Sequence, residues 1–254
     1  MARRHPDLTA LTVINDLVDQ FRVRLDEVVD VQALWAHGSL AMGDFQLGRS
    51  DFDMVALVPT ALDPRQRDAV QALHEDLTRR FEHGSKLHCV YLARDRADDA
   101  ALRHPTWTQG ELVDKPLTPV SRRELDLSGR VFDGPAPDHI LRPVTGDELS
   151  TFSRTDLRDF WYPATAKRRL WLRAIWIDLG SITVVRAARA LSEGRLITKA
   201  EALDRLPELG APKPLADDIR ARRYGAPGLP LDRPLRAAQA RRFVRTTIAR
   251  ILTP

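Results

Sequence analysis

WAHGSLAMGDFQLGRSDFDMVALV, residues 35–58, is the stretch that decides the fold. It begins with a short apolar run and a Gly-Ser turn, crosses a polar loop, and ends in Asp51-Phe52-Asp53 and a second apolar run. Successive side chains of a strand point to opposite faces, so Asp51 and Asp53 are expected to point the same way. Two neighbouring carboxylates repel one another unless a cation lies between them, and hard oxygen ligands of this kind suit Mg²⁺.

The Gly38-Ser39 turn upstream offers backbone N–H groups and a hydroxyl, which can hold phosphate oxygens. A lone Gly-Ser is usually a turn, and a lone Asp-x-Asp is more often a solvated strand edge. Here both occur about a dozen residues apart, each joined to a β-like run. The combination predicts phosphate binding by Gly38 and Ser39 and metal binding by Asp51 and Asp53. Arg49 is a candidate to neutralise phosphate charge with its forked donors, and a solvated loop arginine is the alternative.

The Gly-Ser turn and residues 50–53, with the strand that follows, resemble the signature of the polymerase-β-type nucleotidyltransferase superfamily. Far downstream, RAARALSEGRLITK (residues 186–199) resembles the C-terminal segment of the streptomycin/spectinomycin adenylyltransferase group. These are aminoglycoside-modifying enzymes with a helical C-terminal domain. The resemblance implies an α/β (α+β) nucleotidyltransferase core at residues 1–143. It also implies an all-helical bundle domain at residues 144–254 that contacts substrate and nucleotide.

The same resemblance implies a transferase that moves AMP from ATP to an acceptor hydroxyl with the help of Mg²⁺ and releases pyrophosphate. The implied acceptor is an aminoglycoside antibiotic, and the implied role is antibiotic resistance. Lys199 would reach the nucleotide from the second domain, and Trp107 would lie in the substrate cleft. An ordinary helix lysine and a core tryptophan are the alternatives. Asp178, a charge in an apolar stretch, is a candidate contact for a polycationic acceptor, and a salt bridge to a neighbouring arginine is its alternative.

The third expected strand departs from the family pattern. Such enzymes usually place a carboxylate there, whereas the alternation of LHCVYL (residues 87–92) puts His88 in that position. Imidazole is a poor Mg²⁺ ligand but a competent base near neutral pH. Three interpretations remain open: His88 is the general base; the base comes from elsewhere, for example Glu111; or the protein binds nucleotide without turnover. A different acceptor, such as a protein, a nucleic-acid end or a metabolite, also remains open.

Composition sets the remaining expectations. The chain has 254 residues, of which 43% are hydrophobic and 29% charged, as in soluble globular proteins. No apolar run approaches the ~18 residues of a membrane span, and the N-terminus lacks the apolar region of a secretory signal. One cysteine, Cys89, is expected in the core. We therefore expect a cytoplasmic protein without a membrane partner. The net charge of +4 is spread along helices, so nucleic acid is not an expected partner, and the oligomeric state is left open.

Hydrophobic periodicity predicts the order of elements. In the first domain, helices are expected at residues 8–29 and 64–81, strands at 31–35, 52–58 and 87–92, and short strands or loops at 107–113 and 130–132. Residues 141–145 are expected to link the domains. Beyond them the pattern is helical, with helices expected at residues 146–161, 167–191, 213–224 and 235–252 and another that opens at residue 198.

Overall fold

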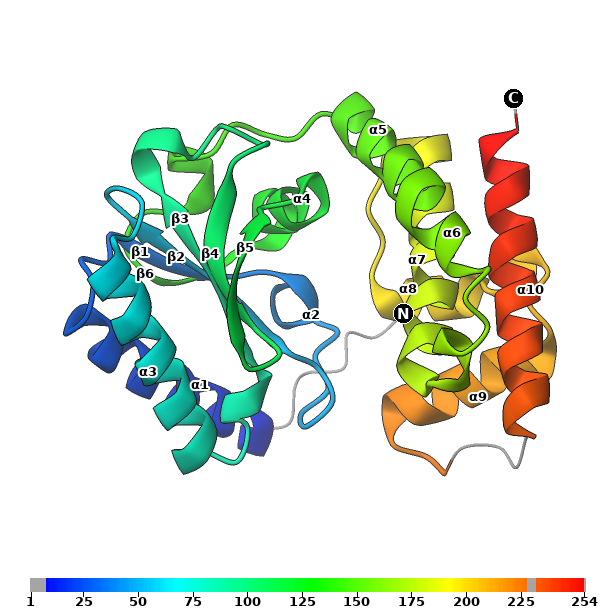
Figure 1. Cartoon of the computed structure of the whole chain (residues 1–254), viewed down its shortest axis with the longest axis horizontal. Coiled ribbons are helices and arrows are strands. Elements are labelled where there is room, and N and C mark those ends of the chain that lie inside the picture. The colour runs from blue at the N-terminus through cyan, green and yellow to red at the C-terminus, as the bar shows by residue number, and fades with distance from the viewer. Residues whose placement is uncertain (1–7, 228–231, 254) are drawn as a thin grey trace. The chain divides into compact units, whose positions relative to one another are not determined.

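The computed structural model of this protein describes residues 8–227 and 232–253. It divides into two compact units, Met1–Val144 (unit 1) and Thr145–Pro254 (unit 2). Within the described residues, the strands all belong to unit 1, and unit 2 is helical (Figure 1). Residues 1–7, for which no secretory signal is expected, lie outside this description. A search of the described helices finds none with the length and apolar character needed to cross a membrane.

The described part of unit 1 forms a six-stranded mixed sheet with the order β5-β4-β3-β2-β1-β6. Strands β2 and β3 are parallel, and the other neighbouring pairs are antiparallel. The elements are α1 (Leu8–Asp26), β1 (Ala33–Ala36), α2 (Gly38–Ala41), β2 (Phe52–Val58), α3 (Pro64–Arg80), η1 (Gly84–Lys86), β3 (Leu87–Ala93), η2 (Arg94–Arg96), β4 (Arg103–Thr108), β5 (Glu111–Pro116), α4 (Pro119–Ser128), β6 (Arg130–Asp133) and η3 (Pro137–His139).

Helices cover both faces of this sheet, and each face has its own apolar core. Helices α1 and α3 pack on the face that includes Phe52, Met54 and Cys89. On the other face, Val55 packs with Leu125 of α4. Because strand side chains alternate, residues 53 and 55 of β2 share the α4 face, whereas residues 52 and 54 share the α3 face.

Two features of unit 1 differ from the sequence expectation. Residues 107–113 are not one segment but contain the turn of the β4–β5 hairpin. Gln109 and Gly110 both have positive φ, 53° and 83°, as a two-residue hairpin turn requires. Helix α4 was not expected at all. It begins at Pro119 after Thr118, whose side chain accepts a hydrogen bond from the N–H of Ser121.

Unit 2 is a bundle whose longest helices are α7 and α10. Its elements are α5 (Gly146–Asp156), the π-helical turn η4 (Leu157–Trp161), α6 (Tyr162–Ala164), η5 (Leu170–Leu172), α7 (Ala174–Glu193), α8 (Lys199–Arg205), η6 (Pro207–Leu209), α9 (Lys213–Tyr224) and α10 (Arg233–Leu252). The expected helix at 167–191 is interrupted, because Arg173 is extended and α7 begins after it. Gly180 then lets the Trp171 ring pack against α7, since an added Cβ would lie 2.7 Å from that ring.

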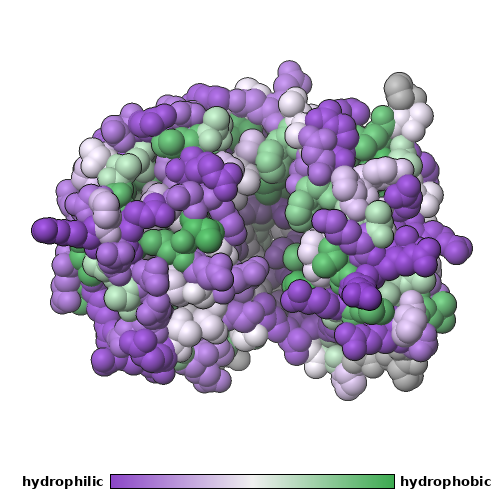
Figure 2. All heavy atoms as spheres, in the orientation of Figure 1, coloured by the Kyte–Doolittle hydropathy of each residue, from purple (hydrophilic) through white to green (hydrophobic). Residues whose placement is uncertain are grey.

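The two units differ in charge although both surfaces are polar. Residues 1–144 contain 18 Lys and Arg against 23 Asp and Glu, a balance of −5, whereas residues 145–254 contain 21 against 12, a balance of +9. Figure 2 shows hydrophilic side chains over most of the visible face, with apolar patches scattered among them. The small net charge of the chain is therefore the sum of a negatively charged unit 1 and a positively charged unit 2.

Candidate active site

Asp53 and His88 face one another on neighbouring strands. The parallel register pairs Asp53 of β2 with His88 of β3, and His88 Nδ1 lies 3.7 Å from Asp53 Oδ1. Both side chains point to the α4 face, because their neighbours Phe52 and Cys89 pack in the α3-side core. The side chains are 30% and 19% exposed, so a ligand from solvent can reach this pair. The structure thus brings together these two predicted site residues.

The Gly-Ser turn lies directly against Asp53. Gly38 has φ +64°, and a Cβ built there would lie 2.5 Å from Asp53 Oδ2. The backbone N–H of His37 also donates to the Asp53 carbonyl at 2.9 Å. Glycine is therefore required at position 38 both for its left-handed backbone and for the close approach of the carboxylate. Ser39, in the first turn of α2, is buried beside it.

A closed turn connects this region to the carboxylates. Ser50 donates its N–H to the Gln46 carbonyl at 2.8 Å, and its hydroxyl accepts from the Gln46 N–H at 3.0 Å. Arg49 is exposed on this turn, and its N–H also donates to the Gln46 carbonyl. The turn fixes the backbone that enters Asp51, so the loop presents Arg49 within two residues of the first carboxylate.

Lys86 is a site residue that the sequence reasoning missed. Its ammonium lies 3.3 Å from Asp51 Oδ1, and the two side chains are 36% and 41% exposed. Lys86 ends η1 and directly precedes β3, two residues before His88. Strand alternation gave no signal for this contact, because Lys86 lies in the η1 turn and not in β3.

A buried His–Glu pair lies behind the Gly-Ser turn. His37 Nδ1 is 3.0 Å from Glu124 Oε2, and both residues are buried. Burial lowers the pKa of His37, but the Glu124 hydrogen bond and the nearby charges of Asp53 and Glu124 outweigh it and leave that pKa raised. Sequence reasoning missed the pair because it missed α4, which carries Glu124. The pair ties the residue that precedes Gly38 to α4.

Trp107 is not placed with Asp53 and His88. It pairs with Cys89 and so points to the α3 face, where its ring stacks on His74 at 4.9 Å between centroids and 8° between planes. Trp107 is 2% exposed, so it offers no free face to a sugar. This arrangement favours the core alternative for Trp107. Burial, with a smaller effect from His88, lowers the pKa of His74 to about 3.

Glu111 lies on the same face as the carboxylates. It pairs with Thr108 across the β4–β5 hairpin, and the β3–β4 register, continued by one residue, sets Thr108 opposite His88. Asp53, His88, Thr108 and Glu111 therefore form a row across four strands. Neighbouring strands are ~4.8 Å apart, so the backbone of Glu111 lies roughly 10 Å from that of His88.

In unit 2, the predicted residue Asp178 is held by an arginine. Arg222 of α9 contacts both carboxylate oxygens of Asp178, with Nη2 2.6 Å from Oδ1, and also pairs with the fully buried Asp218. A salt bridge was the expected alternative for Asp178, but its partner is not a neighbouring arginine, because Arg222 lies 44 residues further along the chain. Lys199 is the first residue of α8, after a capping box between Thr198 and Glu201.

Comparisons with known proteins identify the fold. No family model matches the sequence, and no curated protein matches it. Among solved structures, the chain is similar to a spectinomycin adenyltransferase from Enterococcus faecialis, solved with ATP and spectinomycin. The TM-score is 0.65 at 9% sequence identity, and the match covers 91% of this chain and 98% of the other. The chain has the nucleotidyltransferase fold.

The carboxylates of this nucleotidyltransferase fold suit a metal that arrives with a nucleotide. Among the described residues, no group of three or more His, Cys, Asp and Glu is placed to hold a metal by itself. Mg²⁺, however, usually keeps several waters and binds through one or two carboxylates together with substrate phosphates. Asp51 and Asp53 are the predicted pair. Both are partly exposed, and Asp53 lies beside the Gly38 turn.

Proposed function

We propose that the protein is a Mg²⁺-dependent nucleotidyltransferase that moves AMP from ATP to a hydroxyl of a small acceptor and releases pyrophosphate. The observation that carries this proposal is the contact of Asp53 with both His88 and the Gly38 turn. A carboxylate beside a basic side chain and a glycine turn is suited to phosphoryl chemistry. The similarity to a nucleotidyltransferase solved with ATP supports it at the level of the fold.

Each candidate residue near the start of β2 and β3 has a role in this proposal. Backbone N–H groups at Gly38 and the Ser39 hydroxyl bind the β- and γ-phosphates, and Arg49 neutralises part of their charge. Asp51 and Asp53 would hold Mg²⁺, which when bound supplies stabilisation of the charge that develops on the α-phosphate. Lys199 of unit 2 stays a predicted nucleotide contact.

His88 is the proposed general base. The acceptor oxygen forms a bond to the α-phosphorus, the bond from that phosphorus to the pyrophosphate oxygen breaks, and His88 takes the hydroxyl proton. A positioned base contributes roughly 10²–10⁴-fold, and positioning and charge stabilisation supply most of the rest. Glu111 is the alternative base, since it shares the face and the row of His88. Nucleotide binding without turnover is the second candidate function, because imidazole replaces the usual carboxylate at this position.

An aminoglycoside or aminocyclitol is the proposed acceptor. The support is the similar structure, which was solved with spectinomycin. The Asp178 carboxylate is already paired with Arg222, so a cationic acceptor gains less from it than from an unpaired carboxylate. Asp178 therefore contributes to acceptor binding only if that pair opens, and a protein, nucleic-acid or metabolite acceptor is the alternative.

Pyrophosphate release from ATP and Mg²⁺ tests the proposal, with a panel of aminoglycosides and aminocyclitols as acceptors. We expect release with at least one acceptor and its loss in Asp53→Asn. His88→Ala should reduce kcat by about 10²–10⁴-fold, and Glu111→Gln should stay within a few-fold of wild type. A large loss of kcat in Glu111→Gln, with little change in His88→Ala, would assign the role of general base to Glu111 instead of His88. Asp53-dependent ATP binding without release for any acceptor would favour the binding function.

A further inference from the structure

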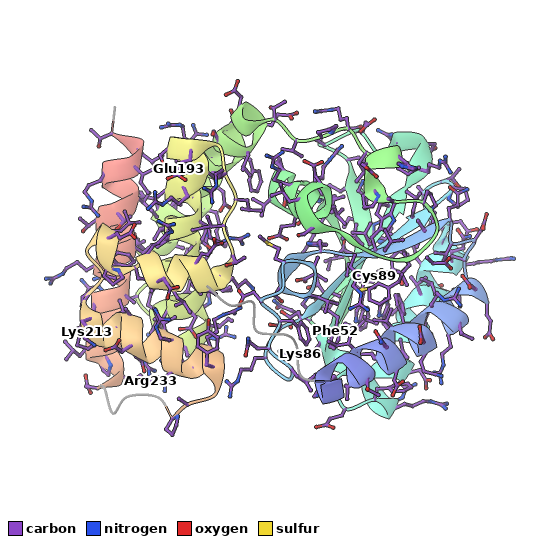
Figure 3. All side chains as sticks on the ribbon, turned by 180° about the vertical axis from the view of Figure 1, so that it is seen from behind. Phe52, Lys86, Cys89, Glu193, Lys213 and Arg233 are labelled. Atoms are coloured by element: carbon purple, nitrogen blue, oxygen red, sulfur yellow. The ribbon has the colours of Figure 1, made fainter. Side chains whose placement is uncertain are left out.

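Lys86 and His88 place two basic groups opposite the two carboxylates. Lys86 faces Asp51 at 3.3 Å, and His88 faces Asp53 at 3.7 Å. The second contact follows from the parallel register of β2 and β3, and the first joins the two residues that directly precede these strands. Figure 3 labels Lys86 beside Phe52, the first residue of β2. His88 therefore belongs to the sheet framework of the site, whereas Lys86 ends the η1 turn directly before it.

The Lys86 ammonium changes what the carboxylate pair can bind. Asp51 and Asp53 alone carry a charge of −2, and Lys86 reduces it to −1. A divalent cation that approaches Asp51 must displace this ammonium or lie close to it. Two charges ~4 Å apart interact by roughly 1 kcal/mol even at the dielectric constant of water, and a divalent ion doubles this energy. The ammonium thus disfavours the entry of a metal ion by itself.

Lys86 also has the freedom to change partner. Asp51 is its ion-pair partner among the described residues, and Lys86 is 36% exposed. A lysine carries its charge as a compact ammonium on a flexible four-carbon stem, without the fixed fork of an arginine. A nucleotide that binds with a metal held by Asp51 would bring its phosphate oxygens close to Asp51. An ammonium released there would be within reach of those oxygens.

We propose that Lys86 exchanges partners during nucleotide binding. In the free protein it holds Asp51 and keeps divalent cations out of the carboxylate pair. When the metal arrives with the nucleotide, Lys86 leaves Asp51 and pairs with the triphosphate. The inference rests on the proposed function, and it makes Lys86 a nucleotide-binding residue that also prevents occupation by the metal alone.

The exchange predicts opposite changes in two affinities. Lys86→Gln removes the charge and should tighten the binding of Mn²⁺, used as the probe cation without nucleotide, by roughly 3- to 10-fold. The same variant should weaken ATP binding in the presence of Mg²⁺ by a similar factor, because the triphosphate loses a cation. A residue with only a structural role would change both affinities in the same direction.

Electron paramagnetic resonance of free Mn²⁺ measures the first affinity, and equilibrium dialysis with labelled ATP measures the second, both on the full chain. Lys86→Arg, which keeps the charge, should bind Mn²⁺ as the wild type does. Lys115→Gln on β5, an exposed lysine of the same unit, is the matched control and should change neither affinity. Asp53→Asn measures how much Mn²⁺ and ATP bind without an intact carboxylate pair.

The outcomes separate this inference from the proposed function. Opposite shifts in Lys86→Gln, absent in Lys86→Arg and Lys115→Gln, support the exchange. Unchanged affinities, or two shifts of the same sign, overturn it while Asp53-dependent ATP binding keeps the proposed function. Wild-type protein that shows no Asp53-dependent ATP binding removes the proposed function and this inference with it.

Discussion

The candidate site carboxylates of the two units differ in exposure and in the basic side chains that contact them. In unit 1, Asp51 and Asp53 are partly exposed and contact their basic partners at 3.3 and 3.7 Å through single atoms. In unit 2, Arg222 contacts both carboxylate oxygens of Asp178, and the shortest distance, from Nη2 to Oδ1, is 2.6 Å. The first arrangement leaves oxygen ligands available to a cation from solvent. In the second arrangement, a salt bridge within the fold already occupies the carboxylate oxygens.

Residue type alone therefore does not identify a binding carboxylate. All these residues are aspartates beside apolar segments, and the sequence made both Asp53 and Asp178 site candidates. They differ in the partner that tertiary packing supplies, a flexible lysine or a histidine in unit 1 and a forked arginine in unit 2.

The largest expected effect tests the structural role of the unit 2 pair. Arg222→Ala leaves Asp178 and the fully buried Asp218 without their main partner, so we expect a loss of about 3 kcal/mol in the free energy of unfolding. The control is Arg220→Ala, because Arg220 pairs with Asp204 on the exposed surface and should cost less than about 1 kcal/mol. Urea unfolding followed by circular dichroism measures both. Equal, small losses would break the comparison between the units.

A smaller effect tests the close packing at the unit 1 carboxylate. Gly38→Ala places a methyl group 2.5 Å from Asp53 Oδ2, and it should weaken Mg²⁺-dependent ATP binding by about 10-fold, or ~1.4 kcal/mol. Gly43→Ala is matched in backbone strain, with φ +72°, but its new methyl group meets nothing within 4 Å. It should lower stability by about 1 kcal/mol and leave ATP binding unchanged. Isothermal titration calorimetry distinguishes the variants, and equal losses of affinity would assign the effect to strain in the loop.

The smallest effect concerns the interior of unit 1 behind the site. The pKa of His74 falls to about 3 in the folded protein, against about 6.5 unfolded, so the unfolded chain binds the proton first. The stability linked to this group is present above pH 6.5 and is lost as the pH falls toward 3. The slope is at most about 1.4 kcal/mol per pH unit.

His74→Phe keeps an aromatic ring against Trp107 but removes this titration. The variant loses the contact with the Tyr91 hydroxyl and should be less stable at pH 7. Its unfolding free energy should nevertheless fall by roughly 0.7 kcal/mol less than that of wild type between pH 7 and pH 6. Equal falls in urea unfolding would show that folding does not lower the pKa of His74.

Strongly periodic elements could be predicted from the sequence alone. Strand β2 spans the predicted residues 52–58, because a short apolar run follows a polar loop. Helix α9 spans the predicted residues 213–224, because its apolar residues recur at helical spacing. Helix α4 could not be predicted in this way. Two of its buried residues are Arg122 and Glu124. Its inner face is therefore charged, and a charged helix face is normally predicted to be exposed to solvent. The buried polar partners of these residues come from other segments.

By itself, the sequence determined where β2 starts and predicted most groups of the candidate site. The Gly-Ser turn, Asp51, Asp53 and His88 were all recognisable from residue type and spacing. Only the tertiary structure decided which side chains meet: Lys86 with Asp51, Glu124 with His37, and Arg222 with Asp178. Strand register and helix packing set such contacts between distant segments, and a slip of one residue in β3 would turn His88 to the opposite face. Local spacing carries no information about that choice.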